Sequence, residues 1–135
     1  MVLMLIGVLA TMAYASYDKY LNRTRTAKAV ADIATVSAII QHYALDTHSY
    51  PLSLDDVGYG GMTDPWGNPY IYYNVDRFGK GGSRKDHALN PLNTDFDLYS
   101  MGPDGNTSKQ ITQKSALDDI IRAGNGSYVG VAADF

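Results

Sequence analysis

The sequence predicts an α+β fold, in which one long N-terminal helix is followed by a small region of short strands and loops. Two observations point to this fold. No glycine or proline, the two strongest helix breakers, occurs between Gly7 and Pro51. After Pro51 the chain changes to short β-prone runs that are separated by turns rich in glycine and proline. The 135 residues are enough for one domain of ordinary size.

The front of the predicted helix, residues 1–17, is a hydrophobic segment with no apolar–polar periodicity. Residues 1–15 carry no charge, and Thr11 is their only polar interruption. Three interpretations fit such a run: a helix buried in a bilayer or among identical neighbours, a secretory signal peptide, or a core helix. The first is favoured. A signal peptide should begin with basic residues, and these are missing here, although Ala13-Tyr14-Ala15 has the form of a cleavage site. A core helix is disfavoured because the remaining chain is too small to surround it.

Residues 18–50 continue the helix with an amphipathic pattern. Four apolar residues recur at helical spacing: Ile33, Val36, Ile40 and Tyr43. They predict an apolar stripe that faces a small domain. Three basic residues follow the apolar run and form a basic collar: Arg23, Arg25 and Lys28. The collar is either solvated helix surface or a contact for lipid headgroups or acidic residues of a neighbouring subunit.

Residues 51–135 predict a small globular α+β region. Residues 52–57 predict a single helical turn with Ser53 as its N-cap. Residues 70–75 and 96–100 predict two partner strands, and residues 128–131 predict a last strand. The glycine-rich segment at residues 78–94 predicts an exposed, mobile loop.

The composition excludes several classes of function. The absence of cysteine excludes disulfides, thiolate metal sites and a cysteine nucleophile. A net charge of −3 gives no support to a nucleic-acid partner. The three histidines, His42, His48 and His87, have no metal-ligand spacing and are predicted to lie on the surface. No serine-elbow motif and no base–nucleophile pair is present. The protein is therefore predicted not to be an enzyme.

A possible calcium loop follows Pro103. Side-chain oxygens stand at alternate positions, Asp104, Asn106 and Ser108, which is the spacing with which a calcium loop opens. The EF-hand pattern is not completed, because its glycine and its closing glutamate are missing. Asp118 and Asp119 come slightly later and could close a larger loop. Calcium takes about six to eight oxygen ligands, which two carboxylates and backbone carbonyls can supply. The same residues also have the composition of an ordinary turn.

Three stretches, in order after the apolar helix, resemble the major pseudopilins of bacterial type II secretion systems: YPLSLD at 50–55, DPWGNPY at 64–70 and DLYSMGPDG at 97–105. The resemblance covers nearly the whole chain, and DPWGNPY is its specific motif. It implies a pilin-like fold, with a small antiparallel sheet packed on the C-terminal half of a long helix. It also implies a subunit of a helical, homo-oligomeric filament in the periplasm, which drives protein export together with other pseudopilins and inner-membrane secretion components. The helix would lie in the bacterial inner membrane and the C-terminal region in the periplasm.

The same resemblance implies bound Ca²⁺. Family members bind the ion in the C-terminal loop through two aspartates, which match Asp104 and Asp119 here, and a backbone carbonyl near Met101. Asp118, Asn106 and Ser108 are further candidate ligands from the spacing. The tail at residues 118–123 departs from the family form, which ends in a tryptophan, so among the side chains the resemblance supports only Asp104 and Asp119 as ligands.

The start of the sequence departs from the family. Precursors carry a basic leader, a glycine at the peptidase site, a phenylalanine that becomes methylated and a glutamate a few residues later, and none of these is present. If Gly7 matches the glycine of the family's apolar segment, we expect a truncated start. Truncation would also explain why the apolar run is shorter than the roughly 20 residues of a complete membrane span.

Two alternatives stay open. A type IV pilin for adhesion, motility or DNA uptake has the same general design, but such pilins often close their C-terminal loop with a disulfide, and this chain has no cysteine. A secreted calcium- or carbohydrate-binding module behind a signal peptide is the alternative from a different class.

Overall fold

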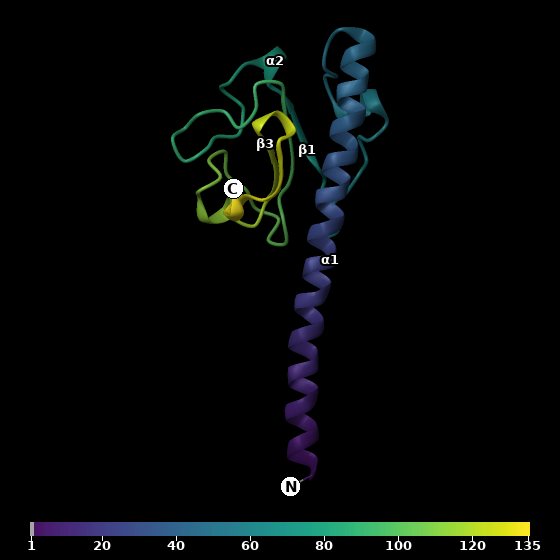
Figure 1. Cartoon of the computed structure of the whole chain (residues 1–135), viewed down its shortest axis with the longest axis vertical. Coiled ribbons are helices and arrows are strands. Elements are labelled where there is room, and N and C mark those ends of the chain that lie inside the picture. Colours follow the sequence, from purple (N-terminus) through teal and green to yellow (C-terminus); the bar gives the residue numbers. More distant parts are fainter. Residues whose placement is uncertain (1) are drawn as a thin grey trace.

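The molecule consists of a long helical rod with a small domain packed on its C-terminal part (Figure 1). The computed structural model describes residues 2–135, apart from the side chains of residues 2, 3 and 5, so the prediction for residue 1 lies outside it. The rod is a single α-helix, α1 (Val2–Thr47). It ends three residues before Tyr50, and the chain then turns back along the domain through Pro51.

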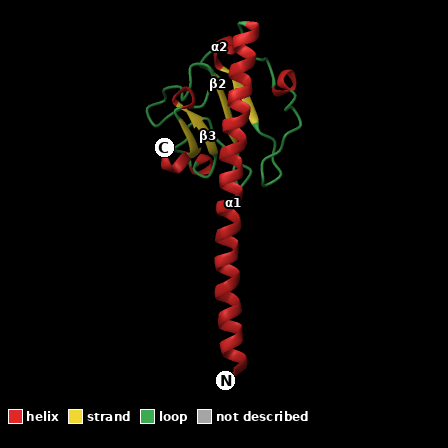
Figure 2. Cartoon of the chain, turned by 45° about the vertical axis from the view of Figure 1, so that its right-hand side comes forward, coloured by secondary structure: helices red, strands yellow, loops and turns green. Residues whose placement is uncertain are grey.

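Four short strands form one antiparallel sheet in the order β1-β2-β3-β4 (Figure 2). They are β1 (Ile71–Asn74), β2 (Phe96–Ser100), β3 (Ile120–Ala123) and β4 (Tyr128–Val131). The register pairs Tyr72 with Leu98, Tyr99 with Ile121, and Ile121 with Gly130. The expected long helix on a small antiparallel sheet is thus confirmed. The strands predicted near residues 70–75, 96–100 and 128–131 are present, and residues 120–123 add a strand that the sequence analysis did not predict.

The core lies between the sheet and the apolar stripe of α1. Ala29, Ile33, Val36 and Ile40 are all at most 3% exposed. They form one cluster with residues of the sheet and its flanking loops, among them Tyr70, Phe96, Leu98 and Ile120. Burying each large aliphatic side chain of this kind stabilises the fold by about 1.5–3 kcal/mol. The predicted stripe is confirmed, with Tyr43 half-buried at its upper end.

The opposite face of the sheet is covered by loops. Side chains alternate along β3, so Ile120 packs toward α1 while Ile121 joins a second cluster with Leu92, Ile111 and Ala132. Short helical turns connect the strands: α2 (Val75–Phe78) and 3-10 turns at Leu54–Val57, Lys114–Ala116, Gly124–Gly126 and Ala132–Asp134. The first of these 3-10 turns follows Ser53, as predicted.

The prediction of a wholly exposed loop at residues 78–94 is wrong in part. Ser83, Arg84 and Asn93 are at most 3% exposed. Asn93 donates hydrogen bonds to the Asp97 carboxylate and to the carbonyl of Arg122, each at 2.8 Å. Arg84 forms a buried ion pair described below. Buried polar groups of this kind need partners, and these partners hold both ends of the loop against the sheet.

Candidate functional site

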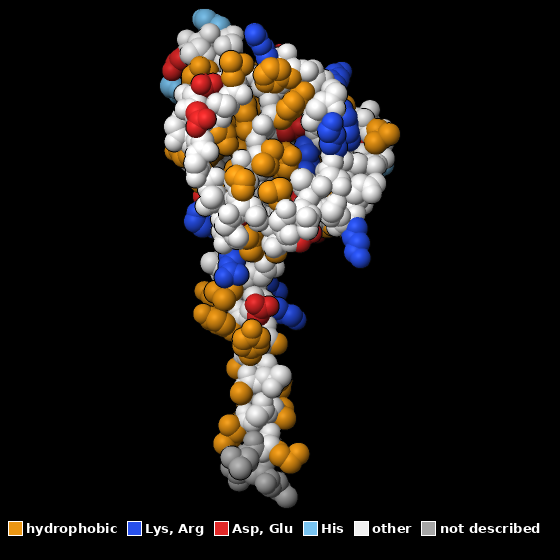
Figure 3. All heavy atoms as spheres, turned by 180° about the vertical axis from the view of Figure 1, so that it is seen from behind, with side chains coloured by type: hydrophobic (Ala, Val, Ile, Leu, Met, Phe, Trp, Pro, Cys, Tyr) orange, Lys and Arg blue, Asp and Glu red, His pale blue; other side chains and the backbone are white. Residues whose placement is uncertain are grey.

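The N-terminal half of α1 projects beyond the domain and exposes large apolar and aromatic side chains (Figures 1 and 3). Eight of them are between 58% and 77% exposed: Met4, Ile6, Val8, Leu9, Met12, Tyr14, Tyr17 and Tyr20. The polar Thr11 bonds back to the carbonyl of Gly7 at 2.9 Å, so its hydroxyl is satisfied within the helix. A continuous apolar surface of this size on one chain marks a contact with another molecule.

Within residues 2–135, no helix is both long enough and apolar enough to cross a bilayer.

The basic collar stands where α1 enters the domain. Arg23 and Arg25 are exposed. Lys28 forms an ion pair with Asp32 at 2.9 Å, one helical turn further along. Asp32 also accepts a hydrogen bond from the Tyr70 hydroxyl at 2.8 Å, which links the helix to the sheet. Burial, followed by this bond to Asp32, raises the pKa of Tyr70, so the phenol stays protonated as a donor. Lys28 is therefore linked to the domain through Asp32, whereas Arg23 and Arg25 are available for a contact with another molecule.

The DPWGNPY motif is hydrogen-bonded to the start of the C-terminal loop, which begins at Met101 directly after β2. One carboxylate oxygen of Asp64 accepts from the backbone N–H groups of Trp66 and Asn68, at 3.0 and 2.9 Å. The other accepts from the hydroxyl of Ser100, which itself accepts from the N–H of Gly102 at 3.0 Å. Two of the stretches that carry the resemblance are therefore one hydrogen-bonded unit, although they are far apart in the sequence.

Gly102 brings the C-terminal loop against the segment before β3. Its φ of +66° is in the left-handed region, and a β-carbon there would lie 2.3 Å from the carbonyl oxygen of Asp118. Two residues later the N–H of Asp104 donates to the Asp118 carboxylate at 3.1 Å. The Asp104 carboxylate accepts from the N–H of Asn106 at 2.8 Å. Asp104 and Asp118 are thereby held on the same side of the loop.

Asp118 has the properties of a carboxylate that lacks a positive partner. Its Oδ1 atom is buried and has no hydrogen-bond partner among the described residues. Burial raises the pKa of Asp118, and the nearby charge of Asp104 raises it further. A hard cation between the two carboxylates would remove this repulsion and occupy the unsatisfied oxygen. On these observations Asp104 and Asp118 fit a calcium ion.

Asp119 points the other way. It is fully buried and forms an ion pair with Arg84, whose Nη2 lies 2.7 Å from the Asp119 Oδ2. The Thr107 hydroxyl donates to the same oxygen. The Arg84 guanidinium also lies over the ring of Tyr99, 4.1 Å from its centroid. Burial raises the pKa of Asp119 to about 6, although Thr107 and Arg84 both act against the shift. The adjacent carboxylates therefore diverge, one toward Asp104 and one toward Arg84.

The other candidate ligands are only partly gathered. The Asn106 amide donates to the Asp104 carbonyl at 3.1 Å, so it stays within the loop. The Ser108 hydroxyl is hydrogen-bonded to that of Ser115 at 2.7 Å. Met101 is half-buried at the start of the loop. Across the described residues no group of three or more histidine, cysteine or acidic side chains could hold a metal, so any calcium would depend on two carboxylates and neutral oxygens. The three histidines are exposed, as predicted.

Sequence reasoning missed the two buried arginines. Arg84 was placed in an exposed loop, and Arg122 was not singled out. Arg122 forms an ion pair with Asp95 at 2.7 Å and lies 3.9 Å from the centroid of the Phe96 ring. A local signal existed only for Arg122, which lies in a strand next to two isoleucines. For Arg84 none exists, because its partner is 35 residues away.

Comparison with known proteins gives three similar chains, all named type II secretion system core protein G. Those of Aeromonas hydrophila and Escherichia coli are 27% identical over 125 residues, and that of Pseudomonas aeruginosa is 26% identical over 125 residues. The matches cover 77% of this chain and 77%, 76% and 78% of the respective relatives. No family model and no solved structure matches the chain.

Proposed function

We propose that this chain, which is a homologue of type II secretion system core protein G, the major pseudopilin, is a structural subunit of a pseudopilus. Such a subunit assembles into a periplasmic filament that drives protein export. Pseudopilins are structural proteins, so the homology confirms the prediction that the chain is not an enzyme. We place the subunit at the bacterial inner membrane, with its domain in the periplasm and other secretion components as partners.

The observation that carries this proposal is the difference between the two halves of α1. The stripe from Ala29 to Ile40 is buried by the chain's own sheet, whereas the large apolar side chains described between Met4 and Tyr20 are exposed to water. Apolar helices leave lipid for a protein environment when close packing with neighbouring helices replaces their lipid contacts. A filament core of identical helices provides such an environment.

A pair of matched substitutions tests the assembly role. Leu9 on the projecting helix and Leu89 on the domain are 66% and 64% exposed. Leu9→Asp should abolish sheared filaments and export of a reporter substrate, because it places a charge in the helix core of the assembly. Leu89→Asp is the control and should leave both unchanged. Normal filaments from Leu9→Asp would contradict the proposal.

We further propose that Ca²⁺ stabilises the C-terminal loop. Asp104 and Asp118 would hold the ion, with neutral oxygens of the loop such as the Met101 carbonyl completing its coordination. The ion would neutralise two neighbouring carboxylates and fix the loop to the sheet. Asp119 stays a candidate ligand through its Oδ1 atom, which is also buried without a hydrogen-bond partner among the described residues, while its Oδ2 atom pairs with Arg84. The support for this proposal is the buried, unpartnered Oδ1 of Asp118 and the charge of Asp104 beside it.

Thermal unfolding with and without chelator tests the calcium proposal. Saturating Ca²⁺ should raise the melting temperature relative to EDTA, because an ion that binds only the folded state stabilises it by mass action. Asp104→Ala should abolish this difference. Asp86→Ala is a suitable control, since the Asp86 carboxylate also accepts from two nearby N–H groups, at 2.8 and 2.9 Å, in a different loop. That variant should keep the response to EDTA. Equal melting temperatures of the parent in Ca²⁺ and EDTA would contradict the proposal.

A further inference from the structure

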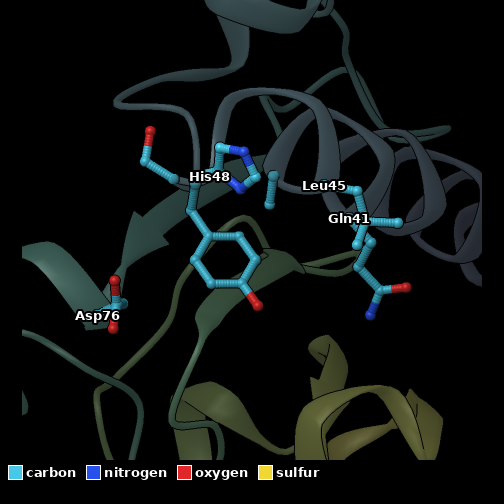
Figure 4. A pocket seen from close by; sticks show the side chains of 7 residues that line it. Gln41, Leu45, His48 and Asp76 are labelled. Carbon is cyan, nitrogen blue, oxygen red and sulfur yellow. The ribbon is translucent and has the colours of Figure 1, made fainter.

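Two adjoining hollows lie beside Tyr50 at the end of the domain farthest from the projecting helix. The first (Figure 4) has a volume of about 550 Å³ and is lined by Gln41 and Leu45 of the last turns of α1, by His48 just after the helix, and by Asp76 of α2. The second, of about 390 Å³, shares Tyr50 and Asp76 with it. The Tyr50 ring packs on the buried Phe96 ring at 5.5 Å between centroids, which fixes its position. We call the two hollows together the groove.

The groove lies in an acidic part of the surface. Four exposed aspartates belong to the segments around it: Asp46, Asp55, Asp56 and Asp76. The opposing charges there are Arg77 and the titratable His42 and His48, of which His42 lies 3.2 Å from Asp46. The groove wall also has an exposed apolar side chain, Leu45, which is 76% exposed. The groove therefore suits a partner segment that combines basic and aromatic or aliphatic side chains.

The chain itself contains a segment of that chemistry just below the domain. We call residues 17–28 of α1 the neck. Its exposed basic residues are Lys19, Arg23, Arg25 and Lys28, of which Lys28 is paired with Asp32. Asp18 is its one exposed acid, and its exposed aromatic residues are Tyr17 and Tyr20. Figure 3 shows basic side chains where the helix meets the domain and acidic side chains at the opposite end. The two ends of the domain thus carry complementary charge.

The length of α1 brings these two surfaces to the same level in a stack of parallel copies. The domain covers α1 from about Ala29 to Thr47, which is roughly 27 Å at about 1.5 Å per residue. A second copy that is shifted along the same direction by about 25 residues, or roughly 38 Å, clears this length. At that shift Arg23 of the upper copy is level with His48 of the lower copy. The neck then passes beside the groove.

We propose that the groove receives the neck of a second copy of this chain, with Arg23 and Arg25 of the upper copy facing Asp76 and Asp46 of the lower copy. The proposal rests on the proposed function, because it requires parallel stacking. It adds a contact between domain and neck to the contacts among apolar helices. The charge pairs set the axial shift between copies, whereas the apolar helices alone would pack at several shifts.

Cysteine cross-linking of assembled filaments tests this contact, and the chain suits the method because it contains no cysteine. The full chain with Arg23→Cys and Asp76→Cys should give a ladder of cross-linked dimers and higher multimers after oxidation or treatment with a short bis-maleimide. The control is Arg23→Cys with Lys109→Cys. Lys109 is exposed on the segment that covers the sheet face opposite α1. Its ladder should be at least tenfold weaker.

Charge reversal provides a second measurement on the same pair. Asp76→Lys should reduce the amount of sheared filament several-fold, and Arg23→Asp in the same chain should restore most of it. Both positions are exposed, so each variant should unfold at the temperature of the parent.

The outcomes separate the two proposals. Filaments that form normally but give no 23–76 ladder above the 23–109 control would overturn the groove contact and leave the pseudopilus role intact. Filaments of Asp76→Lys in parent amounts would also overturn it. Failure of the cysteine-free parent to assemble, in cells that carry the other secretion components, would overturn both proposals. A strong 23–76 ladder with charge rescue would establish the contact.

Discussion

The two halves of α1 have a similar content of apolar residues but opposite surroundings. From Ala29 to Ile40 the apolar side chains lie on one stripe and are buried against the sheet, while the large apolar side chains described between Met4 and Tyr20 lie on several faces of the helix and are exposed. A stripe fits a partner on one side, and the chain supplies that partner itself. An apolar surface on every side needs partners all round, which only lipid or neighbouring copies can provide. The proposed function assigns the first half to assembly, and the packing against the sheet assigns the second half to folding.

The largest expected effect contrasts one isoleucine from each half. Ile33 is fully buried and Ile6 is 58% exposed. Ile33→Asp should leave the domain unfolded at room temperature, because an unpaired buried carboxylate together with lost packing costs more than about 4 kcal/mol. Ile6→Asp should change the melting temperature by less than about 2 °C. The fluorescence of Trp66, the only tryptophan, reports domain unfolding for both. A folded Ile33→Asp domain would show that the stripe is not the core.

The buried arginine gives the next largest effect. Arg84→Ala leaves Asp119 buried without its positive partner, and we expect a loss of about 3–5 kcal/mol in the free energy of unfolding. The control is Arg23→Ala in the exposed collar, for which the change should stay below about 0.5 kcal/mol. Urea denaturation in EDTA measures both. A loss below about 1 kcal/mol for Arg84→Ala would mean that the ion pair does not hold the loop.

Gly102→Ala should have an intermediate effect. The left-handed φ of +66° and the approach of the new β-carbon to the Asp118 carbonyl together should cost about 1–3 kcal/mol. Gly61→Ala is the matched control, because no atom lies within 4 Å of a β-carbon there and its φ is not in the left-handed region. Thermal unfolding distinguishes the two. Equal melting temperatures would show that the loop can move away from Asp118 at no cost.

The smallest effect concerns the hydrogen bond between the sheet and the helix. Tyr70→Phe removes the donor to Asp32 and should cost about 1 kcal/mol. Lys28→Ala removes only an exposed pair between residues one turn apart, and it should cost no more than about 0.5 kcal/mol. The urea concentrations at the unfolding midpoints check this, and the midpoint of Tyr70→Phe should be the lower of the two. A greater loss for Lys28→Ala would reverse the roles assigned to the two contacts.

The fold was largely predictable because its signals are local. The helix follows from an interval without breakers, its buried stripe from the spacing of Ile33, Val36 and Ile40, and β1 and β2 from short β-prone runs between turns. The strand at residues 120–123 was harder to predict, because four residues after two aspartates carry little pattern and pairing with β2 and β4 defines it. Tertiary pairing, not propensity, decided that element.

The candidate site was predictable only in outline. Sequence spacing named Asp104, Asp118 and Asp119 as candidate ligands. Which of the two later aspartates faces Asp104 depends on how the segment before β3 meets Gly102, and the structure selects Asp118. The Oδ2 atom of Asp119 forms an ion pair with Arg84, a residue of another loop that no local sequence pattern marks.

A chain that starts at residue 21 would separate folding from assembly. Its melting temperature should lie within about 2 °C of that of the full chain in the same detergent, because no removed residue whose side chain the structure describes belongs to the core. In sedimentation it should behave as a monomer, while the full chain sediments as filaments or large assemblies. A domain that melts far lower without residues 2–20, or a shortened chain that still assembles, would show that the exposed half of the helix does not serve assembly alone.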